Sequence, residues 1–175
     1  MRPMLVIAML ACAAGPLAAQ ADPKATLLAD WQRLKDNNLH YLDAMPDSGL
    51  AFHPTPGVRT FAEQMEHIVS TNADVAALAV KGLAATPAFG DTAQFLHNKA
   101  ALHRHVAEIY DYMIAAIRDA TPAQLSRVSA MYGQPAAPAT RWLQLSLEHS
   151  VWTLGQTVPY LRLNRIPAPS YSMPF

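Results

Sequence analysis

The chain has 175 residues, of which 51% are apolar, and its 13 basic and 13 acidic side chains give a formal net charge of +0. This length corresponds to one domain and is sufficient to bury a hydrophobic core without disulfide support. The balanced charge provides no positive excess for attraction to nucleic acid or to an anionic membrane, so we expect neither as a partner.

The first 21 residues have the organisation of a secretory signal peptide. Arg2 supplies a positive charge, residues 5–14 form a short apolar run, and Ala19-Gln20-Ala21 matches the small-x-small cleavage pattern. The apolar run is too short to cross a bilayer as an anchor. We therefore predict a signal peptide over 1–21 and a periplasmic or secreted domain over 22–175 with no membrane attachment. An uncleaved anchor is the alternative interpretation.

Cysteine occurs only once, at Cys12, within this leader. The residues before it, Met9-Leu10-Ala11, match a lipobox poorly, which argues against a lipoprotein. A mature chain without cysteine has no disulfide, no thiolate nucleophile and no sulfur ligand for a metal.

A first helix is predicted over residues 22–45, where apolar side chains recur at spacings of three and four. Asp22 is a suitable N-cap, and proline at position 23 is tolerated in a first turn. The stretch 46–59 contains several Pro and Gly residues and is predicted to be a long connection.

A second helix is predicted to begin at Thr60, which forms a capping box with Glu63, and to end at Gly82. Its apolar residues lie on one stripe, and His67 lies at the edge of that stripe, where a neighbouring helix would meet it. Residues 83–97 are again predicted to be a connection.

The third and fourth helices complete the predicted fold. The third is capped by Asn98 or Thr92 and runs to about residue 119, and a connection over 120–139 follows. The fourth, from about residue 140 to 164, is apolar around much of its circumference, including Val151 and Trp152, which is typical of a helix buried by its neighbours. No strand pattern is evident. The expected class is all-α, a four-helix bundle with long Pro/Gly-containing connections.

The histidines are the main candidates for chemistry. They occupy positions 40, 53, 67, 97, 103, 105 and 149. His103 and His105 are two residues apart and therefore face different sides of a helix. His67 and His149 lie on the flanks of apolar helices, where a neutral imidazole needs either a metal or hydrogen bonds. Periodicity alone does not decide between a metal and hydrogen bonds. His149 and Thr153 share a helix face as an i, i+4 pair.

Two segments resemble the DinB/YfiT-like superfamily of four-helix, metal-dependent proteins. They are MPDSGLAFHPTPGVRTFAEQMEHIVSTN, residues 45–72, and LEHSVWTLGQTVPYLRLNRIPAP, residues 147–169. The second is similar to the family's H-x-x-x-H-x-G-Q/N pattern followed by Y-L/M-R. The resemblance implies an up-down-down-up bundle in which helix two supplies one metal ligand and helix four supplies two. On this sequence those ligand positions fall on His67, His149 and Thr153.

Thr153 departs from the family pattern, because a threonine hydroxyl is a weaker ligand than imidazole. Three outcomes follow: another side chain such as His40 or His105 replaces the missing ligand, water or substrate completes a weak site, or the metal has been lost. The cofactor implied by the resemblance is thus a divalent ion, zinc or nickel, or none.

The sequence is compatible with two functions. The first is an exported DinB-like hydrolase or transferase with a weakened metal site, in which Gln156 orients a ligand. The second is a non-catalytic four-helix bundle that binds a small ligand or a protein partner. The partners considered are a small molecule and a second copy in a homodimer, and the sequence identifies neither catalytic residues nor substrate.

Overall fold

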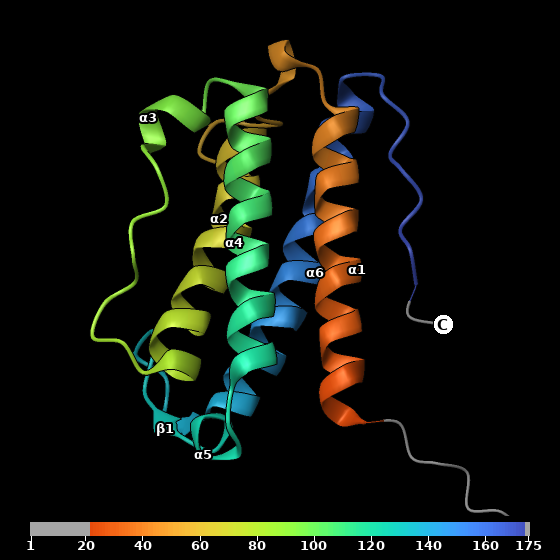
Figure 1. Ribbon diagram of the computed structural model, residues 1–175. Helices are drawn as coiled ribbons and strands as arrows, with labels where there is room; N and C mark the ends of the chain where they lie inside the picture. Colours follow the sequence, from red (N-terminus) through yellow and green to blue (C-terminus); the bar gives the residue numbers. More distant parts are fainter. Residues whose placement is uncertain (1–21, 174–175) are drawn as a thin grey trace, which may run out of the picture.

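Four long helices form the bundle in the computed structural model, which describes residues 22–173 (Figure 1). They are α1 (Pro23–Ala44), α2 (Phe61–Asp74), α4 (Lys99–Asp119) and α6 (Ala139–Leu163). A π-helical segment, Val75–Lys81, continues α2. The predicted signal peptide over 1–21 lies outside the described residues.

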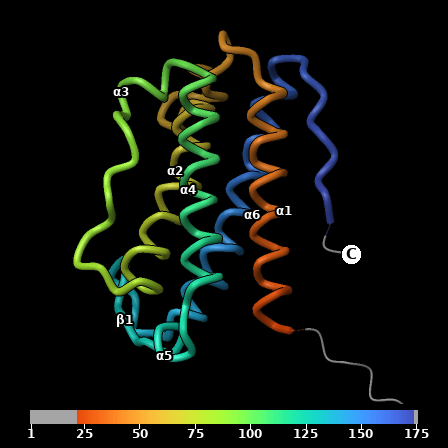
Figure 2. Tube along the Cα trace, in the orientation of Figure 1, coloured from red at the N-terminus to blue at the C-terminus, as the bar shows by residue number. Residues whose placement is uncertain are grey.

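The direction of the helices is up-down-down-up, as expected (Figure 1). Helices α1 and α6 run in one direction, and α2 and α4 run in the other. Two parallel neighbours cannot be joined by a short turn, so residues 82–98 return along the whole length of the bundle before α4 begins (Figure 2). The prediction of a long connection there is confirmed.

Local signals in the sequence set the predicted helix ends. The side chain of Asp22 accepts a hydrogen bond from the backbone N–H of Lys24, and Thr60 and Glu63 form the expected reciprocal capping box. Asn98, rather than Thr92, caps α4. Gly82 adopts a left-handed conformation with φ 71° and ends the second helix.

The connections contain short elements that the pattern analysis does not find. These are a 3₁₀ turn, Asp47–Gly49, the one-turn helices α3 (Thr92–Phe95) and α5 (Pro122–Leu125), and the strands β1 (Val128–Ser129) and β2 (Ala137–Pro138). The sequence pattern does not reveal the two short strands, and the fold is all-α as expected. Two-residue strands are too short to show an alternating pattern. They pair antiparallel, and Trp142 Nε1 donates to the Ser129 carbonyl of β1 at 2.9 Å.

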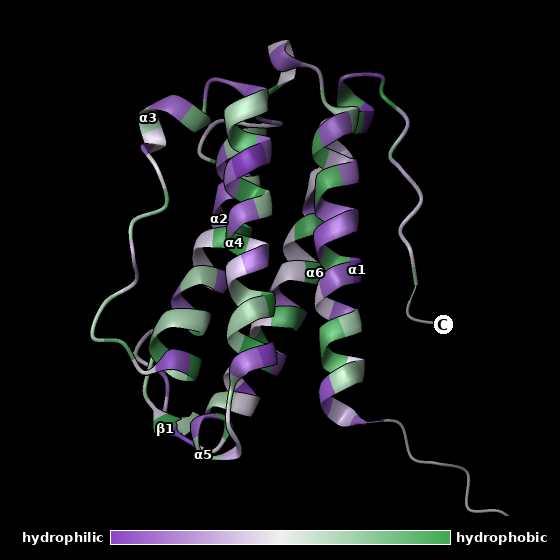
Figure 3. Cartoon of the chain, in the orientation of Figure 1, coloured by the Kyte–Doolittle hydropathy of each residue, from purple (hydrophilic) through white to green (hydrophobic). Residues whose placement is uncertain are grey.

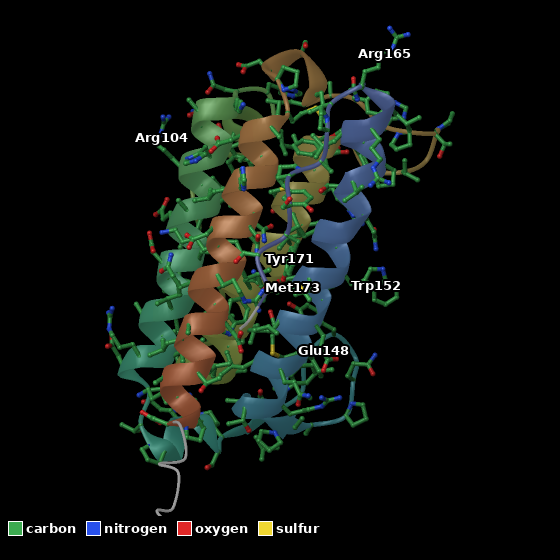
Figure 4. The ribbon with its side chains drawn as sticks, turned by 90° about the vertical axis from the view of Figure 1, so that its right-hand side faces the viewer. Arg104, Glu148, Trp152, Arg165, Tyr171 and Met173 are labelled. Atoms are coloured by element: carbon green, nitrogen blue, oxygen red, sulfur yellow. The ribbon has the colours of Figure 1, made fainter. Side chains whose placement is uncertain are left out.

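The core lies between the four helices, and apolar and polar residues alternate around each of them (Figure 3). Trp31, Phe61, Met65, Tyr110 and Met113 are fully buried. The expectation that α6 is buried around much of its circumference is wrong, because Trp152 is 74% exposed and projects away from the bundle (Figure 4). None of the helices within 22–173 combines the length and hydrophobicity needed to cross a bilayer.

The segment after α6 turns back and lies against α1 (Figure 4). Arg33 Nη1 donates to the Tyr171 hydroxyl at 2.8 Å. Asn37 and the backbone of Ser172 exchange two hydrogen bonds, of 3.2 and 2.9 Å. These contacts fix the tail against α1.

A buried polar cluster crosses the core between α2 and α6. The Asn72 side-chain oxygen accepts hydrogen bonds from the hydroxyls of Ser146, at 2.7 Å, and Ser150, at 2.9 Å. All three residues are buried. Because a buried polar group is costly unless it is paired, this cluster fixes the register of the two helices.

Candidate functional site

Antiparallel packing of α2 against α6 brings His67 and His149 together from opposite helices. Their Nε2 atoms are 3.2 Å apart, and the rings lie nearly perpendicular, with centroids 5.0 Å apart and an interplanar angle of 86°. Both side chains are half-buried. The expectation that these two imidazoles face each other across neighbouring helices agrees with this geometry.

Thr153 lies one turn beyond His149 on the same face of α6. Its hydroxyl oxygen is 3.3 Å from His149 Nε2, and the residue is 4% exposed. The structure thus gathers all three side chains that the resemblance named. The cluster contains two imidazole nitrogens and one neutral hydroxyl.

The spacing of these atoms is compatible with a shared divalent ion. Two ligands about 2.0–2.1 Å from a tetrahedral zinc ion lie about 3.3–3.4 Å apart, close to the 3.2 Å between the two Nε2 atoms. Neutral imidazoles suit zinc and nickel, whereas a hydroxyl adds little binding strength. The residues therefore fit an ion that is held weakly.

Neither of the proposed replacement ligands joins this cluster. Within residues 22–173, no group of three or more His, Cys, Asp or Glu side chains is placed to share an ion. His40 is exposed on α1, and His105 is buried on α4 with its ring stacked on Phe95 at a centroid distance of 3.7 Å. The first of the three sequence-based outcomes, a substitute ligand from elsewhere, therefore has no support in the described fold.

Burial keeps both site histidines neutral near pH 7. Desolvation lowers the pKa of His67 and of His149, and the positive charge of Arg59 lowers both further. A neutral imidazole carries the lone pair that a metal requires. His149 Nδ1 is buried and has no hydrogen-bond partner among the described residues. It therefore lacks the hydrogen bond that commonly orients a metal-ligating histidine through its other ring nitrogen.

A glutamine pair bridges the same two helices, one turn from His67 on α2 and two turns from His149 on α6. Gln64 Nε2 donates to Gln156 Oε1 at 2.8 Å. Gln156, which was predicted to orient a ligand, makes a hydrogen bond across the helix interface. Gln64 was not anticipated, although its position three residues before His67 places both on one side of α2.

An open groove of about 680 Å³ adjoins this glutamine pair. It is lined by Pro54, Gly57, Val58, Arg59, Gln64, Gln156, Pro159 and Tyr160. The Tyr160 hydroxyl donates to the Arg59 carbonyl at 2.8 Å and holds the 50–60 connection against α6. Arg59 was also missed, because a single arginine before a capping box gives no signal in the sequence.

Comparison with known proteins gives one family. The DinB superfamily model matches residues 30–156. Comparison with curated protein sequences gives no match.

Two solved structures are similar in fold. A DinB-like protein of Bacillus subtilis, YjoA, superposes with a TM-score of 0.69 at 16% identity, over 84% of this chain and 98% of the other. A DinB-like protein of Bacillus cereus gives 0.67 at 19% identity, over 83% of this chain and 95% of the other. At these identities the similarity concerns the fold alone.

Proposed function

Because the chain belongs to the DinB superfamily, we propose that it is a divalent-metal-dependent hydrolase or transferase with a weakened metal site. The ion would be zinc or nickel, held by His67, His149 and Thr153. The observation that carries this proposal is the 3.2 Å separation of the two Nε2 atoms, which suits two ligands of one ion.

The residues around the histidines would bind and orient the substrate. A bound ion would supply an activated water or thiol at neutral pH. The groove beside Gln64 and Gln156 admits a small molecule, and the guanidinium of Arg59 favours an anionic group in it. Gln64 and Gln156 both line the groove, and Gln64 is one turn from His67 on α2, so either amide could turn to a ligand there.

Metal binding is the direct test. We expect protein purified without a histidine tag to bind zinc or nickel reversibly and weakly at one site, measured by calorimetry. His149→Ala should abolish this binding, because it leaves only one imidazole. His40→Ala, which removes an exposed histidine from α1, is the matched control and should change nothing. Loss of binding in the control but not in His149→Ala would contradict the assignment.

A non-catalytic bundle is the second candidate function. The same 3.2 Å separation allows one neutral imidazole to donate a hydrogen bond to the other, so the pair is stable without an ion. Absence of any bound ion after incubation with zinc and nickel would favour this candidate over the first.

We also propose that the domain is exported after residues 1–21 are removed. Asp22, the first residue after the proposed cleavage site, is the N-cap of α1, so cleavage there leaves the described helices intact. N-terminal sequencing of protein recovered from the periplasm of a bacterial host should read Asp-Pro-Lys-Ala. An intact leader in a membrane fraction would instead indicate an uncleaved anchor.

A further inference from the structure

A second cavity lies between α2, α4 and the long connection that joins them. Its volume is about 280 Å³, and neither His67 nor His149 lines it. At about 30 Å³ for each water-sized group, it has room for roughly nine non-hydrogen atoms, a small ligand. We call it the α2–α4 cavity.

His105 lines the α2–α4 cavity with an unsatisfied ring nitrogen. The residue is only 7% exposed, and its Nε2 is buried without a hydrogen-bond partner among the described residues. Desolvation lowers the pKa of His105, so the ring is neutral near pH 7 and has one nitrogen free to accept a hydrogen bond. A buried, unpaired acceptor costs free energy unless a ligand or water satisfies it.

The charged side chains that line the cavity are both carboxylates. Glu66 and Asp74 contribute them from α2, whereas no Lys or Arg lines the cavity. Asp74 already accepts hydrogen bonds from the hydroxyls of Thr86 and Tyr132. Glu66 forms no ion pair with a cationic side chain within residues 22–173. The Ser70 hydroxyl is the hydrogen-bond neighbour of the Glu66 carboxylate, whereas Asp74 has two such partners, so Glu66 has more capacity left for a ligand.

Apart from the hydroxyl-bearing Ser70, Thr86 and Thr92, the rest of the wall is apolar. Phe89 and Phe95 come from the connection, and Ala73 and Ile109 come from the facing helices. A ligand that satisfies this cavity thus needs hydrogen-bond donors and a positive charge at one end, and an apolar body at the other.

We propose that the α2–α4 cavity binds a small primary ammonium compound with an apolar body. The ammonium group donates to the Glu66 carboxylate, because charge-assisted hydrogen bonds are the strongest available there. His105 Nε2 is closed off in the structure, so it becomes the second acceptor only after a turn of the ring exposes it to the cavity. The apolar body packs against Phe89 and Phe95. This site is separate from the proposed metal centre and does not depend on it.

The test uses 2-phenylethylamine, which has nine non-hydrogen atoms, and its neutral analogue 2-phenylethanol. Titration followed by calorimetry or by amide chemical shifts should show saturable binding of the amine at least tenfold tighter than that of the alcohol. The preference should persist in excess chelator and in His149→Ala, which separates this proposal from that of metal binding. Equal binding of the two compounds, or no binding of either, overturns the proposal.

Two variants locate the site. Glu66→Gln should weaken amine binding at least tenfold and leave binding of the alcohol unchanged. Asp36→Asn removes a carboxylate from the exposed face of α1 and should affect neither compound. If Glu66→Gln does not fold, His105→Phe keeps an aromatic ring against Phe95, removes the acceptor, and should also weaken amine binding. Unchanged amine affinity in whichever folded variant is measured places the amine elsewhere and overturns the proposal.

Discussion

Replacing Thr153 with histidine should tighten zinc and nickel binding by more than about 100-fold, since even the loss of an outer-shell partner of a ligand commonly costs 10–100-fold. The hydroxyl at this position is already 3.3 Å from His149 Nε2, so a side chain here points to the pair of imidazoles. A third imidazole would complete the three-ligand set typical of catalytic zinc. Calorimetry on the metal-free variant measures the change.

The control for this prediction is a double variant. Adding His67→Ala to Thr153→His should return the affinity to a weak value, because two imidazoles again remain. Position 153 is 4% exposed, so circular dichroism should first confirm that the larger side chain leaves the bundle folded. A folded Thr153→His protein with no gain in affinity would show that the three positions do not share an ion.

The helices were predictable from the sequence because their ends are set by neighbouring residues. Asp22, Thr60 and Asn98 each cap a helix by bonding to backbone groups two or three residues away. The apolar stripe of α2 likewise lies within one segment. By contrast, the docking of Tyr171 on α1 depends on a partner far along the chain, which no local pattern shows. The strands β1 and β2 are close together in sequence, but each is too short to show an alternating pattern.

The candidate site was predictable only in part. Periodicity placed His67 and His149 on the flanks of apolar helices and Thr153 on the same face as His149, and the family resemblance joined the three as one set of ligand positions. The Gln64–Gln156 bridge depends on the register of two antiparallel helices, which long-range packing decides. Exposure of Trp152 could not be read from hydrophobicity either, because an apolar residue on a bundle helix does not reveal which side lacks a neighbour.

Replacing Asn72 with leucine should reduce the free energy of unfolding by about 2–4 kcal/mol, because the hydroxyls of Ser146 and Ser150 lose their shared acceptor. Leucine keeps the branched shape of asparagine and is larger, so the replacement leaves no cavity, and the loss comes from unsatisfied polar groups and from overpacking. Serine hydroxyls in a helix can instead donate to a carbonyl of the preceding turn. The expected loss is therefore smaller than the summed cost of two buried hydroxyls without partners. For a domain of this size, the melting temperature should fall by about 4–16 °C.

The triple variant Asn72→Leu, Ser146→Ala, Ser150→Ala distinguishes lost hydrogen bonds from poor packing. Removing the donors together with the acceptor leaves no buried hydroxyl unsatisfied at these positions, so we expect the triple variant to recover at least about 1 kcal/mol over Asn72→Leu. Urea unfolding curves of the wild type, the single variant and the triple variant give the comparison. A triple variant no more stable than Asn72→Leu would show that the cluster stabilises the α2–α6 interface through packing. The register that brings His67 to His149 would then not depend on these hydrogen bonds.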